Sequence, residues 1–340
     1  MVKLRYAVIG AGVWGELHAE ACFTDPEVEL TMVCDIDPNK ARSLAERFGA
    51  KGYTTDWREI ATNPIIDAVS VATPDFAHTE PAVAVLKAGK HALVEKPLAT
   101  TVEEAERIVR AADDAKVFLM VDFHNRWNPP YAGAKQAALE GRLGDIRYFY
   151  GRQSLTQHWA QNLMTWADKT STLWFCGSHT IDLARWFMED EVESVFAVSR
   201  SGILESKGIN TEDLIVTILE FRGGGVAVIE NTWLVPDTDP AVEDFQVEVL
   251  GTHGGAYMET FHDRCLVVYG RDRAEYPDMF VRPMVWGQTK GFAIEAIRHF
   301  IDCVKRGVAP SVTGHDGAVV TRIGIAALES ARTGRKVKLS

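Results

Sequence analysis

The feature that most constrains this chain is a glycine-rich turn close to its start. The segment Gly10-Ala-Gly12-Val-Trp-Gly15 follows the apolar run Tyr6–Ile9 and opens a helical pattern over Val13–Phe23. The first glycine permits a tight turn, the second lets a diphosphate approach the backbone, and the third lets helix and strand pack closely. The helix N-terminus presents N–H groups and a positive dipole end to the diphosphate. The turn therefore predicts a dinucleotide-binding Rossmann domain.

A carboxylate at the end of the next strand indicates which dinucleotide is bound. The predicted strand Leu30–Cys34 ends at Asp35, about 20 residues after the last glycine, which is the spacing of a carboxylate that accepts from both adenosine ribose hydroxyls. The same carboxylate would repel a 2′-phosphate, and no arginine stands beside it as a replacement. NAD is therefore favoured over NADP. Asp37 is better explained as the cap of the helix that follows.

The order of apolar runs predicts an α/β fold with two domains. Up to about residue 123, continuous apolar strands alternate with helices, which is typical of a doubly wound parallel sheet covered on both faces. Beyond this point strands follow one another with few helices between them, which favours a largely antiparallel sheet. We expect a Rossmann domain over 1–123 and a second α/β domain over 124–340, whose last strand or helix can return to the first domain. The strands expected are Tyr6–Ile9, Leu30–Cys34, Ala68–Ala72, Ala92–Val94, Phe118–Val121, Ile146–Tyr150, Val192–Val198, Leu214–Phe221, Val226–Leu234, Phe245–Leu250 and Leu266–Tyr269.

Composition excludes several classes of partner. The formal net charge is −11, so the chain lacks the basic surface that nucleic acids or anionic membranes attract. It contains no apolar run long enough to span a membrane and no signal-peptide pattern, so a cytoplasmic protein is expected. The five cysteines are widely spaced and form no zinc-binding pattern, so we expect reduced thiols and no metal site.

Three further motifs narrow the choice among Rossmann proteins. They are Val71-Ala-Thr-Pro74 followed by His78, then Val94-Glu-Lys-Pro97, then Arg126-Trp-Asn-Pro129. Together they resemble the Gfo/Idh/MocA oxidoreductase family, which includes inositol dehydrogenases and glucose–fructose oxidoreductase, and the resemblance covers essentially the whole chain. It implies a C-terminal α/β domain with a large open, mainly antiparallel sheet. Because that sheet commonly forms a subunit interface, a homodimer or homotetramer is expected.

The resemblance also implies a catalytic lysine and a cofactor groove. Lys96 would stand between the nicotinamide ribose and the substrate hydroxyl, with Glu95 orienting it. Hydride leaves a carbinol carbon only as the hydroxyl proton is removed. A lysine can assist as a cation that lowers the pKa of the hydroxyl, or as a base if desolvation lowers its own pKa. The residues assigned to the cofactor are Gly10, Gly12, Val13, Trp14, Gly15, Asp35, Ile36, Ala72, Thr73, Pro74, His78, Glu95 and Lys96.

His179 is the second candidate catalytic residue. It lies in Gly177-Ser-His-Thr-Ile-Asp182, just before a helical pattern, and an imidazole can act as a base near neutral pH. The family usually has an aspartate four residues earlier that forms a proton relay with this histidine. Here that position is Phe175, so the usual orienting carboxylate is missing. Asp182 is expected either to hydrogen-bond Lys96 or a neighbouring side chain, or to be an ordinary first-turn carboxylate.

Residues 152–175 form a stretch rich in tryptophan, amides and hydroxyls, which predicts a long functional loop. Indole rings pack on the apolar face of a sugar while amides and charged groups bind its hydroxyls, although tryptophans equally serve as core or interface anchors. His124 leaves the last Rossmann strand at its carboxyl end, where such sheets bind ligands. The residues expected to contact substrate are Lys96, His124, Arg126, Asn128, Gln153, His158, Trp159, Phe175 and His179.

Three functions fit these features. The first is an NAD-dependent dehydrogenase that oxidises a secondary hydroxyl of a sugar, sugar derivative or cyclitol, with Lys96 and His179 handling the proton. The second is a regulator that binds NAD or a sugar without turnover, which the phenylalanine at position 175 favours. The third is an enzyme that cleaves a glycoside through transient oxidation by tightly held NAD.

Overall fold

A computed structural model describes residues 3–241, 243–259, 266–269 and 274–339. The chain divides into two compact units. Unit 1 is Met1–His124 with Met284–Thr321, and unit 2 is Asn125–Pro283 with Arg322–Ser340. Over the described ranges, no helix has the length and apolar character needed to cross a membrane.

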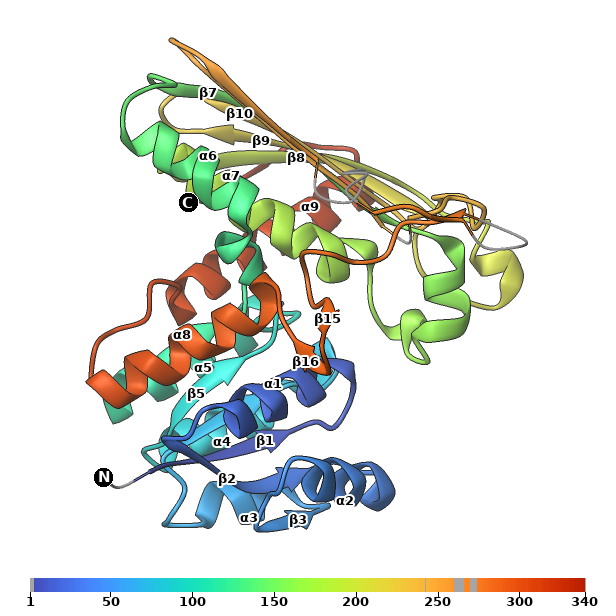
Figure 1. Ribbon diagram of the computed structural model, residues 1–340. Coiled ribbons are helices and arrows are strands. Elements are labelled where there is room, and N and C mark those ends of the chain that lie inside the picture. Colours follow the sequence, from blue (N-terminus) through green and yellow to red (C-terminus); the bar gives the residue numbers. More distant parts are fainter. Residues whose placement is uncertain (1–2, 242, 260–265, 270–273, 340) are drawn as a thin grey trace. The chain divides into compact units, whose positions relative to one another are not determined.

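Unit 1 is built on a six-stranded parallel sheet in the order β3-β2-β1-β4-β5-β6. The strand order reverses between β1 and β4, so right-handed crossovers place the helices before and after this point on opposite faces, as Figure 1 shows. Because both faces are covered, the central strands β4 and β5 are almost entirely buried. The strands are β1 (Leu4–Ile9), β2 (Val28–Cys34), β3 (Gly52–Thr54), β4 (Ala68–Val71), β5 (His91–Val94) and β6 (Leu119–Val121).

The helices of unit 1 follow the predicted alternation. Helix α2 is capped by Asp37, whose carboxylate accepts from the Asn39 N–H, as expected. A late segment of the chain adds α8, which packs beside α1. The helices are α1 (Val13–Thr24), α2 (Pro38–Arg47), α3 (Trp57–Thr62), α4 (Thr79–Lys87), α5 (Val102–Ala115), α8 (Phe292–Arg306) and the first part of α9 (Gly314–Thr333); β15 (Met284–Val285) and β16 (Gln288–Thr289) form a hairpin.

Unit 2 contains a seven-stranded sheet in the order β12-β11-β7-β10-β9-β8-β17. Strands β7 and β10 are parallel and the other neighbours are antiparallel. The turn at Arg222–Gly225 joins β9 to β10 as a hairpin. The strands are β7 (Ile146–Leu155), β8 (Val192–Arg200), β9 (Leu214–Phe221), β10 (Val226–Thr232), β11 (Glu243–Gly251), β12 (Gly255–Glu259) and β17 (Val337–Lys338), with a short separate pair of β13 (Val268–Tyr269) and β14 (Ala274–Glu275).

The two faces of this sheet differ. Helix α7 (Ser178–Met188) packs against β7 and β10, and residues on that face, such as Phe149, Ile229 and Leu219, are buried. Alternate residues on the other face stay half-buried or exposed. Helix α6 (Pro129–Leu139) lies beside β12. The α/β fold class, with a doubly wound parallel sheet and a mainly antiparallel second sheet, is confirmed.

The loop expected over residues 152–175 is partly wrong. Residues 152–155 continue strand β7 and pair with β11, because Gln153 and Leu155 extend the inward-facing alternation of that strand. Residues 159–163 and 173–177 form short π-helical turns, and the second leads directly into α7. Four cysteines are free thiols, whereas Cys265 lies outside the described residues. Of the predicted strand Leu266–Tyr269, the structure forms β13 from Val268–Tyr269 alone.

Candidate active site

The glycine turn has the geometry that a dinucleotide site needs. Gly10 adopts φ +103°, and a Cβ there would stand 2.3 Å from the Ala72 carbonyl oxygen. A Cβ on Gly15 would lie 1.8 Å from the Gly10 carbonyl oxygen, so β1 and α1 approach as closely as the motif predicts. By contrast, Gly12 faces open space at the N-terminus of α1 and provides no side-chain cap. The first N–H groups of the helix are therefore available to an anion.

Asp35 is held in place beside this turn. Its Oδ2 accepts from the Ala11 N–H at 2.7 Å and its Oδ1 accepts from the Asp37 N–H at 2.9 Å. Each carboxylate oxygen keeps a lone pair for a further donor such as a ribose hydroxyl. The next residue, Ile36, is 93% exposed and offers an apolar surface at the same edge.

These residues fit NAD. At Gly12 the open space beside the helix N-terminus is a cradle for the diphosphate, and a Cβ would fill it. The oriented carboxylate of Asp35 suits a ribose diol. The exposed side chain of Ile36 suits the face of an adenine ring. Thr73 adds a buried hydroxyl whose Oγ1 has no hydrogen-bond partner among the described residues, which is an available contact for a polar ligand group.

Lys96 lies at the carboxyl edge of the same sheet, directly after β5, and its side chain is buried. The backbone on both sides of it is anchored. Glu95 Oε2 accepts from the Lys96 N–H at 3.2 Å, and the Lys96–Pro97 peptide bond is cis. The His78 ring lies between two carbonyl oxygens, with Nδ1 2.8 Å from Pro97 O and Nε2 2.8 Å from Thr73 O. His78 thus connects the motif that contains Thr73 with the motif that contains Pro97.

Several residues that the sequence did not single out surround Glu95. His18 on α1 places Nε2 3.1 Å from Glu95 Oε1, and Asp122 after β6 lies 3.8 Å from the same nitrogen. Burial raises the pKa of Glu95, but the His18 hydrogen bond and the neighbouring His18, His124 and Lys96 side chains outweigh this and hold it below its usual range. Burial and the Glu95 charge raise the pKa of Asp122 well above its usual range. The position of Asp122 at a strand carboxyl end is the one sequence signal for this group.

In unit 2, His179 is buried in the first turn of α7. Asp182, one turn later, accepts two hydrogen bonds from Arg126, at 2.6 Å from Nη2 and 2.9 Å from Nε. In this bidentate ion pair the Asp182 side chain is buried. Of the partners expected for Asp182, the structure thus supplies Arg126, and the guanidinium of Arg126 is oriented by this carboxylate.

Phe175 belongs to an aromatic cluster. Its ring centroid lies 5.7 Å from Trp233, 6.4 Å from Trp159 and 6.3 Å from Trp166. These rings pack on a buried apolar group that includes Leu155 and Cys176. Trp159 and Trp166 of this stretch thus pack, partly buried, against the core of unit 2.

The remaining substrate candidates occupy different settings. Asn128 caps α6 and is fully buried, and neither polar atom of its amide has a hydrogen-bond partner in the described parts of the chain. Gln153 Nε2 donates to Glu243 at 2.6 Å, and His158 is exposed. The sequence missed Asn231, which donates to the Gln153 carbonyl oxygen and has a buried Oδ1 with no partner among the residues that the structure describes. The contact between Asn231 and Gln153 depends on the parallel pairing of β7 and β10, which no local sequence motif predicts.

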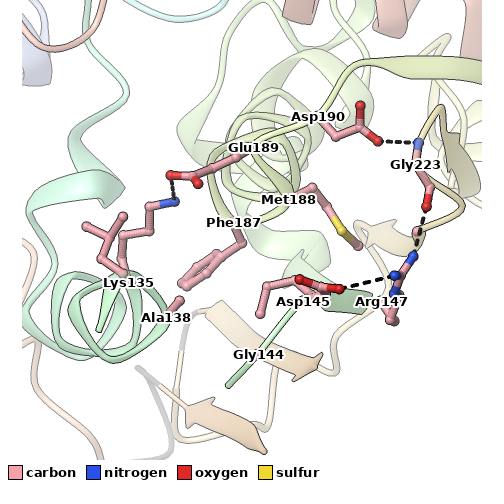
Figure 2. Close-up of a pocket in the computed structure, with 13 residues that line it drawn as sticks. Lys135, Ala138, Gly144, Asp145, Arg147, Phe187, Met188, Glu189, Asp190 and Gly223 are labelled. Carbon is pink, nitrogen blue, oxygen red and sulfur yellow. Dashed lines mark hydrogen bonds and ion pairs between the residues drawn. The ribbon is translucent and has the colours of Figure 1, made fainter. Parts of the chain in front are cut away.

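A surface hollow in unit 2 lies elsewhere, between α6, the end of α7 and the start of β7 (Figure 2). Its charged side chains are paired with neighbours: Lys135 with Glu189 at 2.7 Å, and Arg147 with Asp145 at 3.3 Å. Arg147 also donates to the Gly223 carbonyl oxygen. Because these groups already have protein partners, we assign no ligand to this hollow.

Comparison with known families decides the relationship. Residues 4–123 match the NAD-binding Rossmann fold of an oxidoreductase family, and residues 135–339 match the C-terminal alpha/beta domain of the same family. The chain belongs to the Gfo/Idh/MocA oxidoreductase family. The resemblance inferred from the three motifs is confirmed, and unit 1 of this oxidoreductase contains an NAD-binding domain.

Curated relatives of known activity align along nearly the full length of the chain. The scyllo-inositol 2-dehydrogenase (NAD(+)) of Bacillus subtilis is 28% identical, with 99% of this chain and 96% of that protein covered. The levoglucosan dehydrogenase of Pseudarthrobacter phenanthrenivorans is 29% identical, with 97% of both chains covered.

Solved structures show the same fold. GenD2 from gentamicin A biosynthesis, in complex with NAD, has a TM-score of 0.88 at 27% identity, covering 100% of this chain and 97% of that one. A levoglucosan dehydrogenase in complex with NADH and levoglucosan has a TM-score of 0.82 at 28% identity, covering 99% of both chains.

Proposed function

We propose that this protein is an NAD-dependent dehydrogenase that oxidises a secondary hydroxyl of a sugar, sugar derivative or cyclitol. The observation that carries the proposal is the placement of Lys96. It is buried at the carboxyl edge of the NAD-binding sheet, and its backbone is anchored by Glu95 on one side and by His78 through Pro97 on the other. The inositol and levoglucosan dehydrogenases among the relatives support a cyclic polyol as substrate.

In this proposal Lys96 handles the substrate proton. Its ammonium group donates a hydrogen bond to the substrate hydroxyl oxygen and lowers the pKa of that hydroxyl, or the neutral amine takes the proton directly. NAD, when bound, accepts the hydride. The glycine turn binds the diphosphate, and Asp35 selects against a 2′-phosphate, so NAD is preferred over NADP. His179 receives the proton or holds the hydroxyl.

The substrate contacts stay proposals. Arg126 is pre-oriented by Asp182, and Asn128 offers a buried amide with both polar atoms unsatisfied by the described residues. Both suit hydroxyl recognition. Contacts by His124, Gln153, His158, Trp159 and Phe175 remain predictions.

We also propose assembly through the open face of the unit 2 sheet. A row of side chains crosses six strands there, with each residue opposite the next. One of the six residues is Glu248, and the other five are aromatic or aliphatic: Tyr257, Tyr150, Val228, Ile218 and Phe196. A second copy of this chain is the proposed partner, as a homodimer or homotetramer.

The alternative is a regulator that binds NAD without turnover. It is favoured by the environment of Phe175, which packs among tryptophans at the position where the family resemblance implies a relay aspartate. NADH binding measured by protein fluorescence, combined with assays against a broad panel of sugars and cyclitols, distinguishes the two. Turnover of any panel member supports the dehydrogenase, and tight binding with no turnover supports the regulator.

A further inference from the structure

A buried chain of polar side chains leads from the middle of the parallel sheet to the residue before Lys96. Tyr6 Oη lies 2.8 Å from Ser70 Oγ, and Ser70 Oγ lies 2.8 Å from His18 Nδ1. On the other side of the ring, His18 Nε2 lies 3.1 Å from Glu95 Oε1. We propose that His18 is a positioning residue for the dehydrogenase reaction, which holds Glu95 ionised and oriented against Lys96. The proposal rests on the role of Lys96 proposed above.

The geometry requires one proton of this chain and gives a consistent direction for the other hydrogen bonds. A carboxylate only accepts hydrogen bonds, so Nε2 of His18 must carry a proton to bond Glu95. The Ser70 hydroxyl can then donate to Nδ1, and the Tyr6 hydroxyl can donate to Ser70. Tyr6, Ser70 and His18 are all fully buried, so no solvent competes for these bonds. The chain therefore fixes both the orientation of the imidazole and its Nε2–H form.

Glu95 transmits this order to Lys96 through its second oxygen. Oε1 takes the His18 hydrogen bond, while Oε2 accepts from the backbone N–H of Lys96. Both bonds are available at once only when the carboxylate is held in one rotamer, and His18 supplies that restraint. Without it, Glu95 is free to rotate and the segment before Lys96 loses one of its anchors.

His18 also decides which of two neighbouring carboxyl groups carries the charge. Glu95 and Asp122 both lie within 4 Å of His18 Nε2, and both side chains are buried. Two adjacent buried carboxylates cannot both ionise easily, so one of them keeps its proton. The shorter contact to His18 favours the charge on Glu95. One negative charge then sits on Glu95, the residue before Lys96, and Asp122 is neutral.

A metal ion is the competing explanation for this group. His18, Glu95 and Asp122 offer ligand atoms that lie within 4.8 Å of one another. A metal would require a deprotonated Nε2 and ionised carboxylates. The 3.1 Å contact between Nε2 and Glu95 is instead that of a hydrogen bond. Metal analysis of the purified protein separates the two explanations.

The kinetic test uses three substitutions in the hydrogen-bonded chain of side chains and one matched control. His18→Leu removes the donor to Glu95, His18→Gln retains an amide donor in the Nε2 position, and Ser70→Ala removes the partner of Nδ1 while changing little volume. We expect His18→Leu to lower kcat about 10- to 100-fold, with KM and the Kd for NADH changed less than about threefold. His18→Gln should recover most of kcat, and Ser70→Ala should give an intermediate loss.

The control is His91→Gln. His91 lies at the start of β5, at the opposite end of that strand from Lys96, and accepts a hydrogen bond from the Phe118 N–H. This variant also loses a partly buried imidazole from the same sheet, so it reports on general destabilisation. We expect a kcat like that of the wild type.

A second readout needs no activity. In protein with 15N-labelled histidine, the ring nitrogen shifts of His18, assigned by their absence in His18→Gln, should show protonated Nε2 and unprotonated Nδ1. Ser70→Ala should mix the two tautomers. A neutral Nδ1–H ring, a stoichiometric bound metal ion, or His18→Leu with wild-type kcat would each overturn the proposal. So would equal losses in kcat, NADH binding and thermal stability that His18→Gln fails to restore.

Failure of this inference is distinguishable from failure of the proposed function. If Lys96→Met abolishes turnover while His18→Leu keeps wild-type kcat, only the role of His18 is wrong. If Lys96→Met retains full turnover, the proposed mechanism fails, and the tautomer measurement still reports on the buried chain by itself.

Discussion

At the scale of single residues, burial decides the charge of His124. His124 packs flat against the Trp14 ring, with centroids 4.9 Å apart, and tilts against Phe292 at 5.7 Å. Burial lowers the pKa of His124 to about 4, although the charge of Glu95 acts in the opposite direction. His124 is therefore neutral near pH 7, and it links the glycine turn to the end of the last parallel strand.

This depressed pKa has a consequence for stability. Histidine in the unfolded chain titrates near pH 6.5, so between about pH 6.5 and about pH 4 the unfolded state binds more protons than the folded state. Stability should therefore fall as the pH falls through this window, by up to ~3 kcal/mol from this residue. His124→Phe keeps an aromatic ring and removes the titration. The free energy of unfolding in urea should decline less between about pH 6.5 and about pH 4.5 for this variant, and identical declines would contradict the assignment.

At the scale of elements, the β1–α1 turn separates two roles of glycine. A Cβ at Gly15 would overlap the backbone of Gly10, whereas a Cβ at Gly12 would meet no protein atom within 4 Å. Gly15 is therefore required by the packing between strand and helix. Gly12 is required only by what approaches the helix N-terminus.

The two positions form a matched pair of substitutions. Gly12→Ala should give a protein with wild-type thermal stability but NADH affinity reduced about tenfold or more, which corresponds to ~1.4 kcal/mol, because the Cβ fills the diphosphate cradle. Gly15→Ala should instead destabilise the fold, seen as a lower Tm without ligand. Wild-type NADH binding by Gly12→Ala, measured by fluorescence titration, would contradict the location of the cradle.

The elements also show how far the sequence alone reaches. The parallel strands, Asp35 and the Glu95–Lys96 motif were predictable because each is a local pattern. The short strand β3 and helix α3 were missed because three and six residues are too few to show a period. His18, Ser70 and Asn231 were missed for another reason: their neighbours come from other strands, so only the folded sheet order brings them together.

At the scale of the whole molecule, the open face of the unit 2 sheet is the main unexplained surface. Tyr257 begins the row that crosses it and is 70% exposed. Isolated apolar residues are common on protein surfaces, but a row across six strands that only Glu248 interrupts with a charge is typical of an interface. The covered face needs no such explanation because α7 packs on it.

A charge at the centre of that row tests the proposed assembly. Val228→Lys places an ammonium group directly opposite Tyr150 and Ile218, with Glu230 two residues along the same strand. We expect this variant to shift a dimer or tetramer toward smaller species in sedimentation or light scattering. Leu139→Lys, on the exposed side of α6, is the control and should leave the assembly unchanged. A wild-type monomer would contradict the proposal.

The central claim is that Lys96 handles the proton in an NAD-dependent oxidation of a cyclic polyol. The most direct measurement is NADH formation, followed at about 340 nm, by the wild type and by Lys96→Met across a panel of cyclitols and sugars. The account predicts that the wild type oxidises at least one panel member, and that Lys96→Met loses activity about 100- to 10,000-fold while still binding NADH. Full turnover by Lys96→Met, or no oxidation of any panel member by the wild type, would contradict it.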